Sequence, residues 1–307
     1  MEYFLLRREI SGGCVKAFER YHPFVLFVYF LAVLVTAMFV QNPVLQLLAL
    51  TGGVLFSVML LNGRELLSQL IFYIPLFLLI ALTNPLFSHN GRTPLFFLNG
   101  NPVTLEAVLY GSAIAVMLIA VLLWCKCFSL IMTSDKFLYL FGKVIPKLSL
   151  VLTLALRFVP LLQKQMRRVS AAQKSMGLYA SQSWFERIRS ALRIMSAMIT
   201  WSLENAVETA STMRARGYGG RRRSQFALFR FQLSDGILLG GIVTLLFGVL
   251  WCVVNGAAAF SYYPGLSRLR TDPEAWILYG LYGVLALLPF FIECKERIQW
   301  RYYRSKI

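Results

Sequence analysis

The sequence predicts an all-α polytopic membrane protein with about six transmembrane helices and a water-exposed basic module of two long helices. Its 307 residues are 58% hydrophobic and carry a formal charge of +17, a combination that soluble domains seldom show. Six apolar runs are long enough to cross about 30 Å of hydrocarbon, at roughly 20 residues each. Residues 161–230 differ, because they hold thirteen Lys and Arg residues. A charge at the membrane centre costs about 2.5–3.5 kcal/mol, so this stretch is expected in water.

The six apolar runs account for most of the remaining chain. They lie at residues 24–40, 44–61, 66–87, 105–132, 236–260 and 274–292. Only Gln41, Asn42 and Pro43 separate the first two, which predicts a tight turn and a helical hairpin. Proton- and ion-coupled carriers usually need ionisable groups near the midplane, so a self-sufficient carrier or channel is disfavoured. The acidic residues of these runs instead lie at the ends: Glu65, Glu106, Asp235, Glu274 and Glu293.

The basic residues are distributed asymmetrically between the two sides of the predicted membrane. With the N-terminus inside and six crossings, 28 of the 31 Lys and Arg residues share the side of the basic module. Only Arg92, Arg268 and Arg270 lie on the other side. The positive-inside rule therefore predicts a multi-pass protein of a prokaryotic cell (inner) membrane with both termini and the module in the cytoplasm. The same rule explains the net charge, so no nucleic-acid partner is expected.

Residues 137–162 are apolar enough to suggest a seventh span, but Lys143, Pro146, Lys147, Arg157 and Pro160 interrupt them. We interpret them as an interfacial or partly re-entrant pair of helices, with Pro146 near the start of the second helix. The predicted organisation is a membrane block at 1–132, interfacial helices and the module at 133–235, and a membrane block with a basic tail at 236–307.

Two amphipathic helices are expected in the module. The first ends at Gly177. The second begins near Ser183, with Glu186 three residues later as in a capping box, and continues to Gly217 over about 50 Å. Its methionines, Met195, Met198 and Met213, would suit an adaptable groove for interchangeable partners, but ordinary packing between the two helices is the favoured interpretation.

Both module helices end in a cluster of small, basic or apolar residues followed by glycine. The clusters are Lys174-Ser175-Met176-Gly177 and Arg214-Ala215-Arg216-Gly217. The carbonyl dipole at a helix C-terminus favours cations, which accounts for each cluster separately. It does not explain why a long amphipathic helix ends in Arg-x-Arg-Gly-Tyr-Gly-Gly. Arginine presents a rigid fork of donors that suits docking into an acidic groove of another protein.

Catalytic and cofactor signatures are missing from the sequence. It contains no phosphate-binding loop, no His-Glu-x-x-His helix and no nucleophile elbow. The five cysteines, together with His22 and His89, show no metal-ligand spacing. We therefore expect no enzyme activity, no cofactor and no metal site. The interpretation that remains is a membrane scaffold with a cytoplasmic docking arm.

Three stretches resemble the transmembrane T component of energy-coupling factor (ECF) transporters, the EcfT/CbiQ family. They are residues 145–160, Ala172-Gln-Lys-Ser-Met-Gly177 and Met213-Arg-Ala-Arg-Gly-Tyr218, and the pairs His22-Pro23 and Asn84-Pro85 also fit. The resemblance implies a helical membrane subunit whose two coupling helices dock into two ABC-type ATPase subunits. It further implies that the same subunit holds a small substrate-binding S component, and that the complex imports a vitamin or a transition-metal ion such as cobalt.

The resemblance makes Arg216 the central docking residue, with Arg214, Ala215 and Gly217 around it. In the first motif, Met176 replaces the arginine that the family usually carries, and Lys174 is the nearest cation. Docking through Ser175, Met176 and Gly177 is then more apolar, or matched to a different ATPase subunit.

A second hypothesis is an integral membrane enzyme or lipid-binding protein. Its basic loop, Arg221 to Arg223, would bind anionic headgroups of membrane lipids. The missing polar catalytic cluster counts against it.

Overall fold

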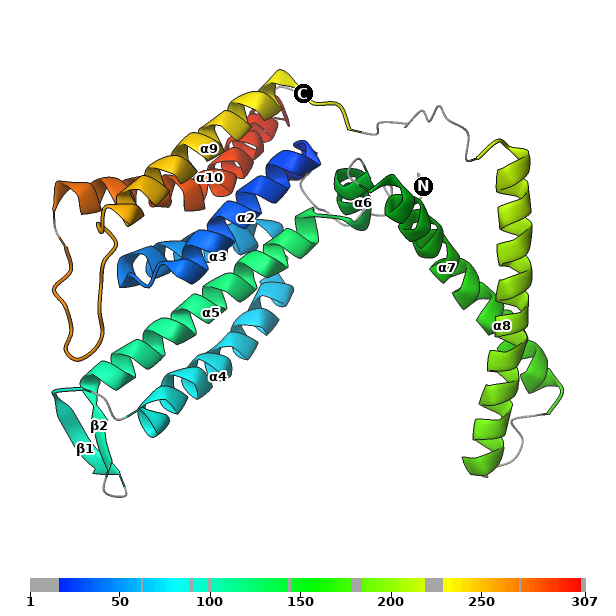
Figure 1. Ribbon diagram of the computed structural model, residues 1–307, viewed down its shortest axis with the longest axis horizontal. Coiled ribbons are helices and arrows are strands. Elements are labelled where there is room, and N and C mark those ends of the chain that lie inside the picture. Colours follow the sequence, from blue (N-terminus) through cyan, green and yellow to red (C-terminus); the bar gives the residue numbers. More distant parts are fainter. Residues whose placement is uncertain are drawn as a thin grey trace. The chain divides into compact units, whose positions relative to one another are not determined.

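The computed structural model describes residues 17–61, 63–88, 91–98, 101–142, 145–177, 184–218, 229–270 and 272–304. In these ranges the chain forms α-helices, one short 3-10 turn and a single β-hairpin (Figure 1). It divides into two compact units, Met1–Lys136 with Phe229–Ile307, and Phe137–Leu228. Some predictions fall outside the described residues: those for Cys14, His89, Lys143, Ser183, Gly219, Gly220 and Arg221 to Arg223.

The first unit contains all six predicted apolar helices. They are α2 (Pro23–Phe39), α3 (Pro43–Leu60), α4 (Gly63–Phe87), α5 (Leu105–Ile131), α9 (Leu233–Val254) and α10 (Pro273–Arg304). Five of them are long and apolar enough to cross a membrane, whereas α2, with 17 residues, is shorter. The predicted all-α polytopic membrane fold is confirmed.

An N-cap residue followed by a proline explains where α2 and α3 begin. The His22 Nδ1 accepts a hydrogen bond from the backbone of Phe24 at 3.3 Å, and Pro23 follows as the first helical residue. The Asn42 side chain accepts from Val44 N at 3.0 Å in the same way, ahead of Pro43. The predicted tight turn between α2 and α3 is therefore confirmed.

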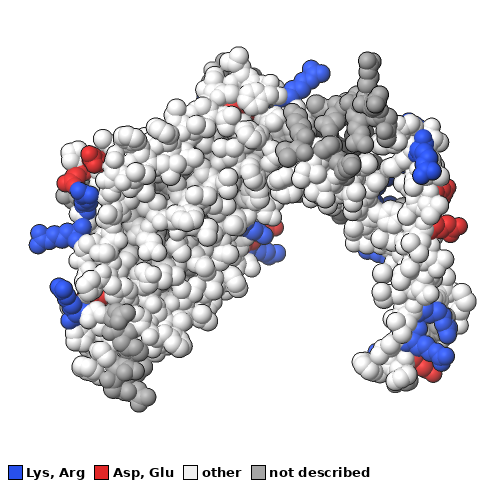
Figure 2. Space-filling model, in the orientation of Figure 1, with Lys and Arg blue, Asp and Glu red and all other residues white. Residues whose placement is uncertain are grey.

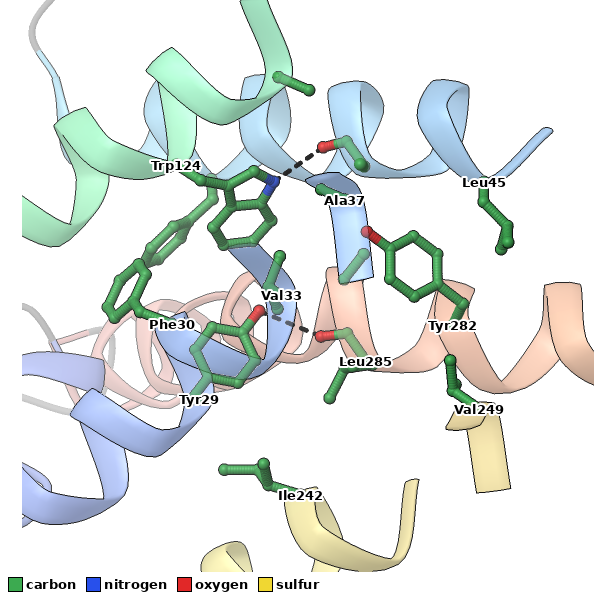
Figure 3. Packing of buried hydrophobic residues seen from close by; sticks show 14 of the residues in the cluster. Tyr29, Phe30, Val33, Ala37, Leu45, Trp124, Ile242, Val249, Tyr282 and Leu285 are labelled. Atoms are coloured by element: carbon green, nitrogen blue, oxygen red, sulfur yellow. Dashed lines mark hydrogen bonds between the residues drawn. The ribbon is translucent and has the colours of Figure 1, made fainter. Parts of the chain in front are cut away.

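A cluster of aromatic side chains joins α2, α3, α5 and α10 (Figure 3). The buried Trp124 donates its indole N–H to Ala49 O at 2.9 Å. The buried Tyr29 donates its hydroxyl to Leu285 O at 3.0 Å. Because buried polar groups are costly without partners, these two bonds fix the register of four helices. Close packing also requires Gly52, since a Cβ there would lie 2.9 Å from Ala286 O.

A β-hairpin in the connection between α4 and α5 was not predicted. Strands β1 (Pro94–Leu98) and β2 (Asn101–Thr104) pair antiparallel. The buried Glu106 holds the start of this hairpin, because its carboxylate accepts from Arg92 N at 3.3 Å and from the Thr93 hydroxyl at 2.8 Å. The hairpin adds a small β element to an otherwise helical protein.

Helix α10 extends twelve residues beyond the predicted end at 292. Glu293 therefore lies inside the helix, about 30 Å from Pro273 at 1.5 Å per residue, which is close to the hydrocarbon thickness. It is 1% exposed and accepts a hydrogen bond from Phe18 N at 3.3 Å. The helix length fits the expectation that this acid lies at the end of its span, and the structure adds that its side chain is buried.

The second unit holds the module. Helix α6 (Ser134–Gly142) leads into it, and α7 (Pro146–Ser175) and α8 (Trp184–Ala215) form its two long arms. Pro146 is the first residue of α7, as predicted. The sequence predicted two separate helices here, an interfacial one that ends near residue 162 and a module helix that follows it. This is wrong, because α7 is one helix that continues through Pro160. Helix-favouring Leu, Ala, Gln, Lys and Arg residues on both sides offset the cost of one interior proline. The interfacial placement and the boundaries at 132/133 and 235/236 stay predictions.

Candidate functional site

Helix α8 ends in a Schellman motif. Gly217 has φ of +75° and donates its N–H to Arg214 O at 3.0 Å, and Tyr218 N donates to Met213 O at 3.0 Å. Arg216 is the last residue before the left-handed glycine, and its own N–H donates to Thr212 O at 3.1 Å. The glycine cap predicted at this end is confirmed.

Helix α7 ends in a glycine cap whose residues correspond one by one to those at the end of α8. Gly177 has φ of +77° and donates to Lys174 O at 3.1 Å, while Met176 N donates to Ala172 O at 3.2 Å. Met176 thus occupies the cap position that Arg216 occupies on α8. Lys174 and Ser175 correspond to Arg214 and Ala215 in the same way, so the two motifs are structural equivalents as well as sequence equivalents.

All eight predicted site residues are exposed. Within the described ranges, the side chains of Lys174, Arg214 and Arg216 form no hydrogen bond or ion pair. Met176 is 73% exposed, which is unusual for a large apolar side chain at a helix end. Each capped end therefore presents groups that can form contacts with another molecule.

The two arms cross and contact each other only along part of their length. The rings of Phe158 on α7 and Trp201 on α8 lie 6.1 Å apart between centroids. Ile194 and Met198 of α8 are buried at the contact, at 8% and 7% exposed. In Figure 1 the capped end of α7 lies near the start of α8, so the two capped ends stand at opposite ends of α8. With 32 residues, α8 separates them by about 48 Å.

A second face of α8 is apolar and exposed. The sequence predicted that the methionines of α8 pack between the two arms. For Met195 this prediction is wrong, because its side chain is 58% exposed, whereas Met198 is buried. The exposed members recur every three or four residues and form one stripe, comprising Ile188, Leu192, Met195, Ile199, Leu203 and Val207. They lie on the side of α8 away from Ile194. The crossing of α7 uses only one of the two apolar faces.

The described residues contain no group of three or more His, Cys, Asp or Glu side chains that could hold a metal ion. The four cysteines among them, Cys125, Cys127, Cys252 and Cys294, are free thiols. The exposed capped ends and the apolar stripe are thus the features of the second unit with evident binding capacity.

The fold and these surfaces define a multi-pass α-helical membrane protein with a module of two long helices that exposes its capped ends and an apolar stripe. The chain belongs to the CbiQ family, described as cobalt transport protein, whose family model matches residues 16–228. The matched region includes both capped ends, and the resemblance found in the sequence is confirmed.

Curated relatives carry a transport name. The chain is 32% identical over 107 residues to the energy-coupling factor transporter transmembrane protein EcfT of Listeria innocua, covering 34% of this chain and 40% of the relative. It is 32% identical over 103 residues to EcfT of Lacticaseibacillus paracasei, covering 33% and 39%. It is 27% identical over 181 residues to EcfT of Staphylococcus aureus, covering 55% and 68%. The chain thus spans about two fifths of the length of the first two relatives.

Proposed function

We propose that the chain is the transmembrane scaffold and energy-coupling subunit of an ECF-type importer. It passes ATP-driven motion from two ABC-type ATPase subunits to a small membrane-embedded S component that binds a vitamin or a transition-metal ion. The observation that carries this proposal is the pair of exposed helix ends, capped in the same register at Gly177 and Gly217. The chain itself performs no catalysis in this role.

The end of α8 docks through charge. The unpaired guanidinium groups of Arg214 and Arg216 enter a groove of one ATPase subunit and bind its carboxylates. Truncating one partner of such a desolvated pair typically costs about 2–5 kcal/mol of binding. The rigid cap matters because it fixes the direction in which these side chains leave the helix.

The end of α7 docks differently. Its cap position holds Met176, so the contact there is mainly dispersion and apolar burial, with Lys174 as the remaining cation. The two ATPase surfaces therefore differ, and we favour two distinct ATPase subunits or two unequal grooves over a symmetric pair.

The exposed stripe of α8 supports the contact with the S component. It runs along one helix face from Ile188 to Val207 and offers apolar area without fixed hydrogen-bond partners. A surface of that kind can hold interchangeable partners, since Met and Leu side chains adapt to different shapes. The module lies in the cytoplasm, where the ATPases bind ATP, and Arg92, Arg268 and Arg270 lie outside.

Co-purification tests the proposal. Tagged protein is solubilised from its native cells in mild detergent, and its companions are identified by peptide mass spectrometry. ATPase subunits are expected with the wild type and with Arg193→Glu, a charge reversal at an exposed position on the side of the same helix. They are expected to be lost with Arg216→Glu. The proposal is overturned if no ATPase subunits accompany the wild type, or if Arg216→Glu retains them fully. Either result favours the membrane-enzyme hypothesis.

A further inference from the structure

The two chain connections between the units are fixed to one short segment of the first unit. The chain leaves that unit at Lys136, in the first turn of α6, and returns to it at Phe229, shortly before α9. Residues 17–22, which precede α2 and are called the anchor segment below, bind residues at both places. Figure 1 shows the end of α5 and the starts of α2 and α9 at the same end of the first unit. On the face drawn in Figure 2, the charged groups of this unit lie near the ends of its helices.

The outgoing connection is held by a buried cation. Lys136 is 5% exposed, and its Nζ donates to Glu19 O of the anchor segment. The same Nζ donates at 3.3 Å to the carbonyl of Ile131, the last residue of α5. A buried ammonium group is stable only where acceptors replace its lost hydration, so moving Lys136 away from these two carbonyls is costly. The lysine therefore fixes the start of α6 both to α5 and to the anchor segment.

The returning connection is held by a buried carboxylate. Asp235 is 4% exposed, and its Oδ1 accepts a hydrogen bond from His22 N of the anchor segment at 3.1 Å. Its Oδ2 accepts from Gln232 N at 2.9 Å, which completes the capping box at the start of α9. The ring of His22 also meets that of Phe231 edge-on, with centroids 5.3 Å apart. One carboxylate thus joins the last residues of this connection to the anchor segment.

The anchor segment is in turn fixed to α2 and α10. Phe18 is fully buried, and its ring lies 5.3 Å from that of Tyr29 on α2 between centroids. Its N–H donates to Glu293 Oε2 of α10 at 3.3 Å, and Arg20 pairs with Glu296 one turn further along the same helix at 2.9 Å. Because the segment is packed and hydrogen-bonded to these helices, a displacement of the segment moves the ends of both.

We propose that the anchor segment is the common attachment point of the module, and that Lys136 and Asp235 are positioning residues that hold its two connections. With both connections fixed at one place, the module has a restricted range of orientations, and its displacement reaches α2 and α10 together. Loss of either residue frees one connection and widens that range. The use of this attachment in energy coupling rests on the function proposed above, whereas the attachment itself does not.

Pulsed electron paramagnetic resonance of the full chain in lipid nanodiscs tests the attachment. Spin labels are attached through p-acetylphenylalanine at two exposed positions, Val58 in the first unit and Thr200 in the module, so that the native cysteines stay unchanged. Lys136→Met and Asp235→Asn are each expected to raise the fraction of distances outside the wild-type distribution about tenfold, because hydrogen bonds of charged groups are roughly twice as strong as neutral ones. The asparagine keeps the volume of the aspartate and loses one of its two acceptor oxygens.

Tyr29→Phe is the matched control for a loss of stability alone. It removes the buried hydroxyl that donates to Leu285 O inside the first unit, so it is expected to lower the melting temperature and to leave the distance distribution unchanged. The proposal is overturned if folded Lys136→Met or Asp235→Asn matches the wild type, or if Tyr29→Phe broadens the distribution as much as they do. The measurement uses this chain alone, so a wild type that co-purifies without ATPase subunits would refute the proposed function and leave the attachment standing.

Discussion

The left-handed cap of α8 can be perturbed at one residue without disturbing any packing. Gly217 has φ of +75°, and a Cβ added there would meet nothing within 4 Å. The cost of Gly217→Ala is therefore purely conformational, about 1–2 kcal/mol for an L-residue in the left-handed helical region. Because the cap is exposed at a helix end, this cost appears as local opening of the last turn and leaves global unfolding almost unchanged.

Hydrogen exchange of the cap amides measures this opening. A cost of 1–2 kcal/mol corresponds to about 5–30-fold faster exchange at Gly217 and Tyr218, whose N–H groups donate to Arg214 O and Met213 O. Asparagine tolerates the left-handed conformation better, so Gly217→Asn is expected to accelerate exchange less than the alanine variant.

A matched control lies in α9. Gly240 also has open space around its Cβ position, but it lies in a helix with ordinary φ, so Gly240→Ala is expected to stabilise its helix by about 0.5–1 kcal/mol. Equal exchange rates at the cap in wild type and Gly217→Ala would refute the reasoning, because they would mean that the left-handed turn does not hold the end of α8.

Two further predictions concern the first unit. Trp124→Phe removes the indole N–H that donates to Ala49 O and shortens a fully buried side chain, and it is expected to destabilise the protein by about 1–3 kcal/mol, measured as a lower melting temperature in detergent; an unchanged melting temperature would contradict the role of this side chain. Glu106→Ala removes the acceptor for Arg92 N and Thr93 N and is expected to speed hydrogen exchange across the β-hairpin, with Val108→Ala on the same helix as the control; protection equal to that of the control would show that the carboxylate does not hold the hairpin.

Features fixed by single residues were predictable from the sequence. Prolines 23 and 43 mark the starts of α2 and α3, because a proline is tolerated in the first turn and His22 and Asn42 supply the caps. The glycines at 177 and 217 mark the ends of α7 and α8, because few other residues adopt positive φ. The equivalence of Met176 and Arg216 follows directly from those two positions.

Features set by competing contacts were not predictable. Pro160 lies inside a continuous helix, because the strength of the flanking helix decides whether a proline ends it. Met195 and Met198 both fit the apolar period of α8, and only the crossing with α7 decides which of them is buried. The β-hairpin consists of strands of five and four residues, too short for an alternating pattern to stand out.

The interior proline gives the two arms of the module different mechanical properties. Pro160 has no N–H, so the carbonyl of Leu156 lacks its usual partner and α7 can bend there at low cost. Helix α8 contains no proline over its 32 residues and resists bending along its whole length. A displacement applied at Arg216 is therefore transmitted as a rigid-body movement of α8, whereas one applied at Met176 is partly absorbed before it reaches Pro146.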